Sequence, residues 1–365
     1  MALDRITLNH FRNHAASRLE GTGHLNLLVG ENGAGKTNVL EALSLFAPGR
    51  GLRRASLDEI AASEGPGTFA ISGALDRPFR QAQGDPVMIG TGTQPDRPGR
   101  RIVQVNGAPT SAVALGEWLA VGWLTPTMDG LFTDSGGARR RYMDRLALAL
   151  DPTHARVASR YEAALRERNR LLAGDDEPDP QWISSIEEQL AEAGAALATG
   201  RAGLIGRLRG ELAALPDSAF ARPTLALASE GPRDAEALAA EFARQRQRDR
   251  GAQRTLIGPH RDDLEVTMAG KGVAAASCST GEQKAMLIAI TLAHAGLAAA
   301  GRPGILLLDE VAAHLDPLRR EALFERLAAG NAQVWLTGTE LAPFEPILGQ
   351  AATWRVSDGH VEPLG

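Results

Sequence analysis

Cysteine is almost absent from this 365-residue sequence, in which Cys278 is the only one. A single cysteine excludes an intramolecular disulfide and any cysteine-cluster metal site, and it agrees with a reducing compartment. No run of about 18 uncharged apolar residues occurs, as a membrane-spanning helix would need. The first eleven residues, MALDRITLNHF, contain no apolar segment typical of a signal peptide. We therefore expect a cytoplasmic protein without a membrane segment.

Lysine is also scarce, with Lys36, Lys271 and Lys284 among 39 basic residues. Because arginine supplies nearly every other positive charge, a lysine at position 36 indicates a chemical requirement. The net charge of -5 predicts no overall basic surface, so any nucleic-acid site must be local. With 44% apolar and 23% charged residues, the composition is typical of a soluble globular protein. The length predicts one large core and a second, smaller lobe.

A phosphate-binding loop follows an apolar run, Leu25 to Val29, and precedes residues with helical spacing. The segment fits the pattern G-x-x-x-x-G-K-[ST], in which backbone N–H groups converge on phosphate oxygens. Lys36 would neutralise the β- and γ-phosphates of ATP, and Thr37 would offer its hydroxyl to Mg²⁺. The predicted nucleotide-binding residues of this segment are Gly30, Glu31, Asn32, Gly33, Ala34, Gly35, Lys36, Thr37 and Asn38.

A second apolar run, Ile305 to Leu308, ends in two carboxylates, as a Walker B strand does. Asp309 would hold Mg²⁺ with Thr37. Glu310 would orient the attacking water, because hydrolysis needs a nucleophile in line with the leaving group. We predict Glu310 and Lys36 as the catalytic residues.

A third motif begins a helix upstream of that strand and is similar to the signature of ABC ATPases; its residues are Ser279, Gly281, Glu282 and Gln283. Ser279 and Glu282 also fit a capping box, which any helix can use for its own N–H groups. The order of motifs favours the signature, since a D-loop-like segment, Ala313 to Asp316, follows the Walker B strand. In such a head a partner's signature faces the γ-phosphate, so ATP-dependent homodimerisation is predicted.

The fold class indicated is α/β, an ABC-type ATPase head with an inserted helical arm lobe. We expect the head in residues 1–128 and 255–365 and the arm in 129–254. Strands are predicted at residues 69–75, 100–107 and 264–268, with a polar, Pro/Gly-rich stretch at 83–99 between the first two. A long helix up to Pro216 could be broken at Gly200, Gly203 and Gly206.

Within the ABC class the sequence resembles the RecF family of bacterial recombination-repair proteins. The resemblance covers nearly the whole chain; its motifs are NHFRNH (9–14), GENG (30–33) leading into KTNVLEA (36–42), RRRYMD (139–144) and LIGPHRDDL (256–264). It implies an ATP-dependent DNA clamp, acting in recombinational repair, replication restart and the SOS response to DNA damage. It also implies loading at gapped or single-/double-strand junction DNA, with RecO and RecR as partners in placing RecA, and it puts Arg12 or Asn13 near the nucleotide.

Two departures from the wider ABC pattern predict a weak ATPase. No glutamine occurs from Trp123 to Phe132, and Thr337 stands at the switch position that usually holds histidine. For DNA, the local candidates are Arg139, Arg140 and Arg141, with a second run at Arg244, Arg246, Arg248 and Arg250.

The sequence disfavours three alternatives to a RecF-like clamp. An ABC transporter subunit is disfavoured by the arm and by these departures, and an SMC- or Rad50-like structural ATPase by arms of only about 50 Å. A nuclease of the overcoming-lysogenisation type would need a further acidic domain.

Overall fold

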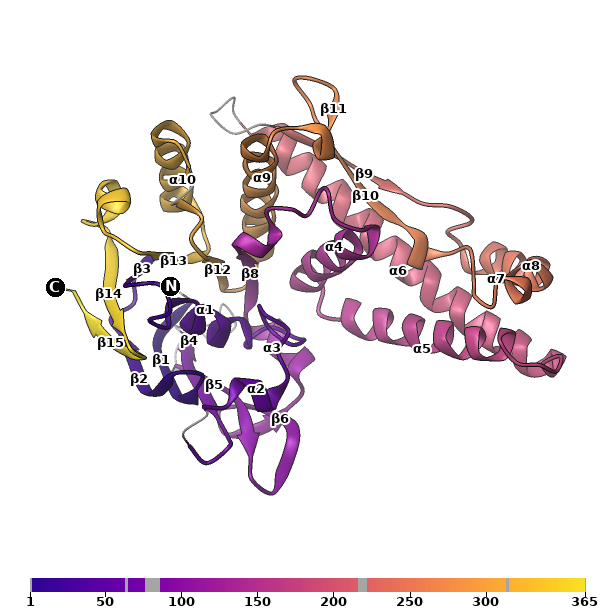
Figure 1. Ribbon diagram of the computed structural model, residues 1–365, viewed down its shortest axis with the longest axis horizontal. Coiled ribbons are helices and arrows are strands. Elements are labelled where there is room, and N and C mark those ends of the chain that lie inside the picture. The colour runs from indigo at the N-terminus through magenta and orange to yellow at the C-terminus, as the bar shows by residue number, and fades with distance from the viewer. Residues whose placement is uncertain (1, 63–64, 76–85, 216–221, 313–314, 365) are drawn as a thin grey trace. The chain divides into compact units, whose positions relative to one another are not determined.

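The computed structural model describes residues 2–62, 65–75, 86–215, 222–312 and 315–364. The chain divides into two compact units, shown in Figure 1. The head unit contains Met1–Asp129 and Ser279–Gly365, and the arm unit contains Gly130–Leu215 and Arg222–Cys278. Nowhere in these described ranges is a helix both long enough and apolar enough to cross a bilayer.

Both boundaries of the arm differ from the prediction. The arm begins one residue later than expected, but it continues to Cys278 instead of ending at residue 254. The reason is strand pairing: β10 (Asp263–Met268) lies antiparallel to β9 (Pro223–Ala228), which is itself in the arm. The strand predicted at 264–268 is therefore correct, but it belongs to the arm and not to the head.

The head is built on a mixed sheet with the strand order β15-β14-β3-β13-β12-β8. Five of its strands are parallel and β15 is antiparallel to β14. The bounds are β3 Leu25–Val29, β8 Ala120–Leu124, β12 Gly304–Leu308, β13 Gln333–Gly338, β14 Ala351–Ser357 and β15 His360–Pro363. Every residue of β3, β12 and β13 is buried, as expected for parallel strands covered on both faces.

The second sheet of the head is antiparallel, with the order β2-β1-β4-β5-β6-β7. Its strands are β1 Leu3–Phe11, β2 His14–Glu20, β4 Ala70–Leu75, β5 Val87–Gln94, β6 Arg97–Val105 and β7 Ala108–Thr110. The stretch at 83–99, expected to lie between strands, contains β5, which pairs with both neighbours, so that prediction was wrong in part. The glycines and threonines of β5 (VMIGTGTQ) interrupt the alternation of apolar and polar residues by which a strand is recognised.

The two sheets share one core, with α1 (Lys36–Ser44) between them. Leu8 of β1, Phe46 after α1, Leu307 of β12 and Trp335 of β13 belong to a single buried cluster. The other head helices are α2 Leu57–Ile60, α3 Ala112–Trp118, η1 Pro126–Met128, α9 Thr280–Ala299, α10 Pro317–Ala329 and η5 Ala342–Ile347. This packing fixes α1, and so the phosphate loop, against the Walker B strand.

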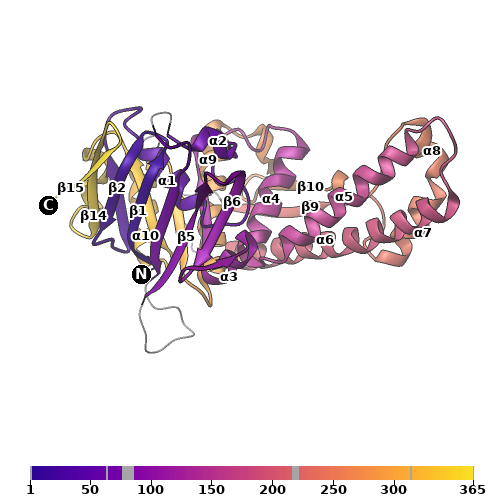
Figure 2. The same ribbon diagram turned by 90° about the horizontal axis from the view of Figure 1, so that it is seen from below.

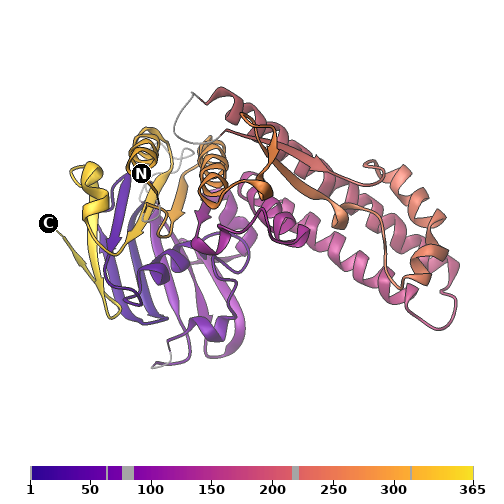
Figure 3. The same cartoon turned by 45° about the horizontal axis from the view of Figure 1, so that its top comes forward.

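The arm consists of helices with a small antiparallel sheet. Its elements are α4 Gly136–Leu150, α5 His154–Leu172, α6 Pro180–Ala214, β9 Pro223–Ala228, α7 Ala235–Arg244, α8 Arg246–Gly251, η2 Pro259–Arg261, β10 Asp263–Met268, β11 Val273–Ala274 and η3 Ala275–Ser277. Figure 2 shows α5 and α6 side by side. Helices α7 and α8 lie near the end of the arm where α5 connects to α6. Figure 3 shows β9 beside α6.

Helix α6 runs unbroken for 35 residues, through the glycines that we expected to interrupt it. One of them serves packing: a Cβ at Gly200 would lie 2.9 Å from Nδ1 of His154. Gly203 and Gly206 have open space around them, and the buried Leu204 and Leu208 hold the same stretch of helix against the arm's interior. Packing of the apolar face therefore outweighs the low helix propensity of glycine.

A buried ion network fastens α5, α6 and α8 together. Arg168 has no exposed surface, and its guanidinium binds Glu187 (3.1 Å) and Asp249 (2.7 Å). It also donates to Thr255 Oγ1 and to the carbonyl oxygen of Phe242. Burial of these charges is tolerated because nearly every donor has a partner.

Replacing Arg168 by methionine should lower the free energy of unfolding by about 3–5 kcal/mol, because Asp249 would stay buried without its arginine partner and Glu187 would keep only Arg246. Urea titration followed by far-ultraviolet circular dichroism measures this. The matched control is Arg166→Met on the same helix, where the side chain is 72% exposed. Equal losses in both variants would contradict the role given to the network.

Candidate active site

The phosphate loop joins β3 to α1, as the sequence predicts. Gly33 and Gly35 have φ angles of 86° and 115°, in the left-handed region that favours glycine. Gly35 is the N-cap of α1, so the first N–H groups of that helix point toward the phosphate loop. Such a helix start attracts phosphate through its N–H groups and its dipole.

Lys36 is only 4% exposed and its ammonium group lies inside the loop. Nζ donates to the carbonyl oxygens of Gly30 (2.7 Å) and Glu31 (2.8 Å). Burial lowers the pKa of Lys36, while the carboxylates of Glu310 and Asp309 act in the opposite direction. The charge is therefore held close to both the loop and the Walker B carboxylates.

Thr37 and Asp309 meet across the site, although they are far apart in the chain. Thr37 Oγ1 lies 2.9 Å from Oδ1 and 3.1 Å from Oδ2 of Asp309. A hydroxyl beside a carboxylate is the hard oxygen donor set that suits Mg²⁺, which keeps several waters and binds substrate phosphates as well. The residues therefore fit the magnesium site expected from the sequence.

Thr337 has a different place from the one predicted. As a switch residue it should be open to the nucleotide, but it is 1% exposed. Its hydroxyl donates to Asp309 Oδ1 (2.9 Å) and accepts from the backbone N–H of Glu310 (2.8 Å). Thr337 therefore orients Asp309 and Glu310 from inside the core of the head. The exposed Thr339, two residues further on, is the threonine that lines the cavity described below.

Glu310 has a φ of 51°, unusual for a residue with a side chain. This conformation costs of order 1–3 kcal/mol and persists only where surrounding contacts impose it. Here the hydrogen bond to Thr337 is such a contact. The half-buried Glu310 thus turns away from the direction of β12 directly after Asp309, and its catalytic role stays a prediction.

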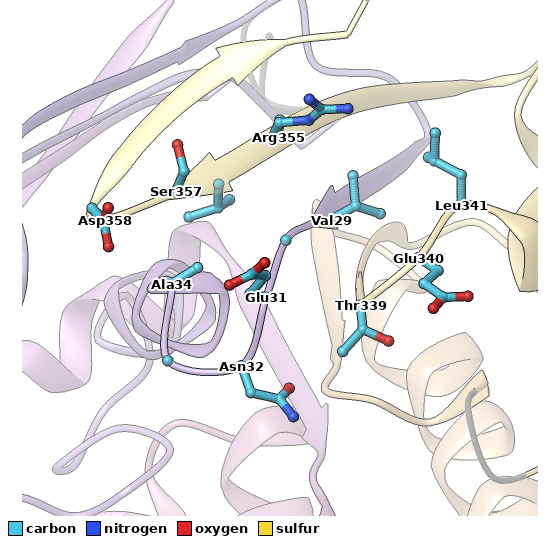
Figure 4. Close-up of a pocket in the computed structure, with 13 residues that line it drawn as sticks. Val29, Glu31, Asn32, Ala34, Thr339, Glu340, Leu341, Arg355, Ser357 and Asp358 are labelled. Carbon is cyan, nitrogen blue, oxygen red and sulfur yellow. The ribbon is translucent and has the colours of Figure 1, made fainter.

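A cavity of about 720 Å³ opens beside the loop, within the size range of ligand pockets. Figure 4 shows the sticks that surround it. Its lining comes from three segments of the head: Val29 to Ala34, Thr339 to Leu341 and Arg355 to Asp358. The last segment, at the end of β14, was not predicted, since nothing in its sequence marks it as part of a site.

Arg12 contacts α1 and Asn13 contacts the phosphate loop, while the place beside the nucleotide that the family resemblance implies for them stays a prediction. Arg12 binds the buried carboxylate of Glu41 through Nε (2.9 Å) and Nη2 (2.7 Å). Asn13 donates to the carbonyl oxygen of Ala34 (3.0 Å) and accepts from Asn38 (2.7 Å). Arg53, which sequence reasoning missed, joins the same network through Asn38 and Glu41.

The signature segment begins α9 as expected. Ser279 is its N-cap and forms the complete capping box with Glu282, so the capping box expected from the sequence is present. Ser279 and Gly281 are also exposed at the helix start, whereas Gln283 is 6% exposed and faces the head interior. Of the D-loop residues, Asp316 caps α10, while Ala313 and His314 lie outside the described residues.

The arginines predicted for DNA contact differ in their surroundings. Arg139 is paired with Asp263, with Nε 2.7 Å from Oδ1. Arg140 is half-buried and donates to the carbonyl oxygen of Asp262, and Arg141 is exposed. In the second run, Arg246 pairs with Glu187 and Arg244 with Glu241. Arg139, Arg244 and Arg246 are thus engaged within the arm.

Comparison with known proteins gives consistent relatives. The family model described as RecF/RecN/SMC N terminal domain matches residues 2–344. Proteins named DNA replication and repair protein RecF from Mesorhizobium japonicum and Brucella suis are each 45% identical, over 99% of this chain and 97% and 96% of their own lengths.

Among solved structures, the recombination mediator protein RecF-ATPrS in the RecFOR pathway matches with a TM-score of 0.84 and 22% identity, covering all of both chains. An Smc head domain from Pyrococcus furiosus, with an extended coiled coil, matches with a TM-score of 0.56 and 15% identity, covering all of this chain and 96% of that one. These likenesses confirm the expected fold class, an α/β ABC-type head.

Replacing Thr337 by valine keeps the side-chain shape but removes the acceptor of the part-buried N–H of Glu310 and the buried donor to Asp309 Oδ1. We expect the free energy of unfolding to fall by about 1–3 kcal/mol. The matched control is Thr339→Val, at an exposed position two residues on, which should change stability little. Urea unfolding of both variants measures the difference, and similar values would show that Thr337 does not support the Walker B pair.

Proposed function

Because this chain belongs to the RecF family, we propose that it is an ATP-controlled, DNA-binding protein of DNA replication and recombinational repair. The main support is the close relationship to proteins of that name over nearly the full length. The observation in the molecule that carries the proposal is the contact between Thr37 and Asp309, which assembles the two halves of an ATPase site.

The chemistry proposed is slow hydrolysis of ATP. The phosphate oxygens accept hydrogen bonds from the N–H groups of the loop. The ammonium group of Lys36 moves from the carbonyl oxygens of Gly30 and Glu31 to the β- and γ-phosphates. Glu310 orients the attacking water. Mg²⁺, held by Thr37 and Asp309 when bound, neutralises charge on the phosphates. Hydrolysis is weak because neither a glutamine between Trp123 and Phe132 nor a switch histidine assists it.

Dimerisation on ATP follows from the exposed start of α9. Ser279 and Gly281 stand at the N-terminus of a 20-residue helix, where the dipole and N–H groups favour an anion. Two heads related by a two-fold axis would each present this helix start to the γ-phosphate held by the other. ATP would thus join two copies of the chain, and hydrolysis would release them.

The DNA proposed is duplex with a gap or a single-/double-strand junction, and the partners are RecO and RecR in placing RecA. Support comes from the names of the relatives and from the RecFOR pathway named for the solved RecF structure. Within the arm, Arg140 and Arg141 are better candidates for phosphate contact than Arg139, which is already ion-paired. Contacts of this kind weaken steeply with salt.

Sedimentation of the protein with a labelled gapped duplex should reveal an ATP-dependent dimer that retains DNA and loses it as salt rises. Lys36→Ala should abolish both dimer and DNA retention, because the phosphates lose their cation. Lys271→Ala, at an exposed position in the arm, is the matched control and should behave like the wild type. A wild-type protein that binds ATP but ignores both gapped and intact duplex would overturn the DNA-binding proposal.

Glu310→Gln should bind ATP normally, reduce its hydrolysis by about a hundredfold or more and accumulate dimers, since the water is no longer activated. Sedimentation and phosphate release report the two effects. Glu345→Gln, an exposed carboxylate of η5, is the control. Normal turnover by Glu310→Gln would remove this residue from the catalytic role.

A further inference from the structure

The C-terminal hairpin, β14 and β15, meets the phosphate loop at its turn. The backbone N–H of Gly359 in that turn donates to the carbonyl oxygen of Ala34 at 3.0 Å. The side chain of Asn13, in the turn between β1 and β2, donates to the same oxygen at 3.0 Å. One carbonyl of the loop thus receives two donors from segments at opposite ends of the chain.

A second connection runs through His14, which has no exposed surface. Its Nε2 lies 3.1 Å from the carbonyl oxygen of Gly35, an acceptor, so Nε2 carries the hydrogen. Nδ1 is then an acceptor 2.9 Å from Ser17 Oγ, and the carbonyl oxygen of Gly359 is a second acceptor 2.9 Å from the same Oγ, so the one hydrogen of the Ser17 hydroxyl is shared between them. His14 and Ser17 therefore link Gly35 in the loop to Gly359 in the hairpin turn.

Two glycines allow this close approach. Gly359 has a φ of 77°, and a Cβ there would lie 2.0 Å from the carbonyl oxygen of Asn13. Gly35 has a φ of 115°, and a Cβ there would lie 2.8 Å from Oδ1 of Asn13 and from Nε2 of His14. Both contacts are shorter than a Cβ can make, so any larger residue would push the turns away from the loop.

We infer that the turn around Gly359, connected through Ser17 and His14, is a positioning element that sets the phosphate-binding conformation of Ala34 and Gly35. These two residues precede Lys36 and direct the N–H groups at the start of α1. Donors displaced from their binding geometry lose affinity, because the loop must then be reordered each time that phosphate binds. None of these hairpin groups needs to touch the nucleotide.

The inference rests on the nucleotide binding proposed above, but not on dimerisation or DNA binding. It predicts a reciprocal effect as well: if the hairpin turn favours the binding conformation, bound ATP must stabilise the hairpin by the same factor. Affinity and hairpin stability can both be measured on the DNA-free protein.

The first test is the affinity for ATP, by titration calorimetry, of Gly359→Ala and Gly107→Ala. Gly107 is the matched control, since it also lies in a hairpin turn of the head with a φ of 78°, but has no atom near its missing Cβ. We expect Gly359→Ala to bind ATP at least about tenfold more weakly, and Gly107→Ala to bind as the wild type does. Equal affinities would overturn the inference; a wild-type protein that failed to bind ATP would overturn the proposed function with it.

The second test uses Ser17→Ala, a small change that should fold normally even if Gly359→Ala does not. In the wild type, ATP should slow hydrogen exchange of the backbone amides of 351–363. In Ser17→Ala that protection should fall, because the connection from His14 to Gly359 is broken. Hairpin protection that survives in Ser17→Ala at saturating ATP would refute the connection, whereas the Walker B assignment would stand.

Discussion

The head depends on one carboxylate, that of Asp309. Oδ1 is 2.9 Å from the hydroxyls of both Thr37 and Thr337, so the Walker B strand is tied to the phosphate loop and to its neighbouring strand β13. Thr337 in turn supports the N–H of Glu310 in its unusual conformation. The phosphate loop, β12 and β13 are far apart in sequence, so all three have to be folded together before Asp309 and Glu310 take their positions. A polar group shared in this way costs stability if any member is lost.

The motifs proposed to bind and hydrolyse ATP could be predicted from the sequence because each one is continuous. Gly30 to Thr37 contains its own turn chemistry, and Ile305 to Glu310 shows its burial by composition alone. Their juxtaposition followed from the order of motifs. The roles of neighbouring side chains could not be predicted in this way. Arg12 has the charge to bind a phosphate, but it forms an ion pair with the buried Glu41. A pairing of that kind depends on distances that no local pattern encodes.

Errors in the predicted fold have a similar origin. The strand at 264–268 was predicted correctly, but which sheet it joins depends on its long-range pairing with β9. Helix α6 survives its glycines because Leu204 and Leu208 are buried on one face. The contact of Gly359 with the phosphate loop left no sequence signal either, since a glycine in a hairpin turn is ordinary. In each case tertiary packing, which a local sequence pattern does not encode, decided the outcome.

Strand order in the head has a consequence for synthesis of the protein. β3 lies between β13 and β14, so both neighbours of this apolar strand are encoded near the end of the chain. At about 5–20 residues per second, a ribosome takes roughly 15–60 s to reach them after β3 has been made. Throughout that interval the two edges of β3 have no partner strand, which is a hazard for aggregation. Nascent chains of this protein are therefore expected to need protection by a chaperone, even though the finished head buries the strand completely.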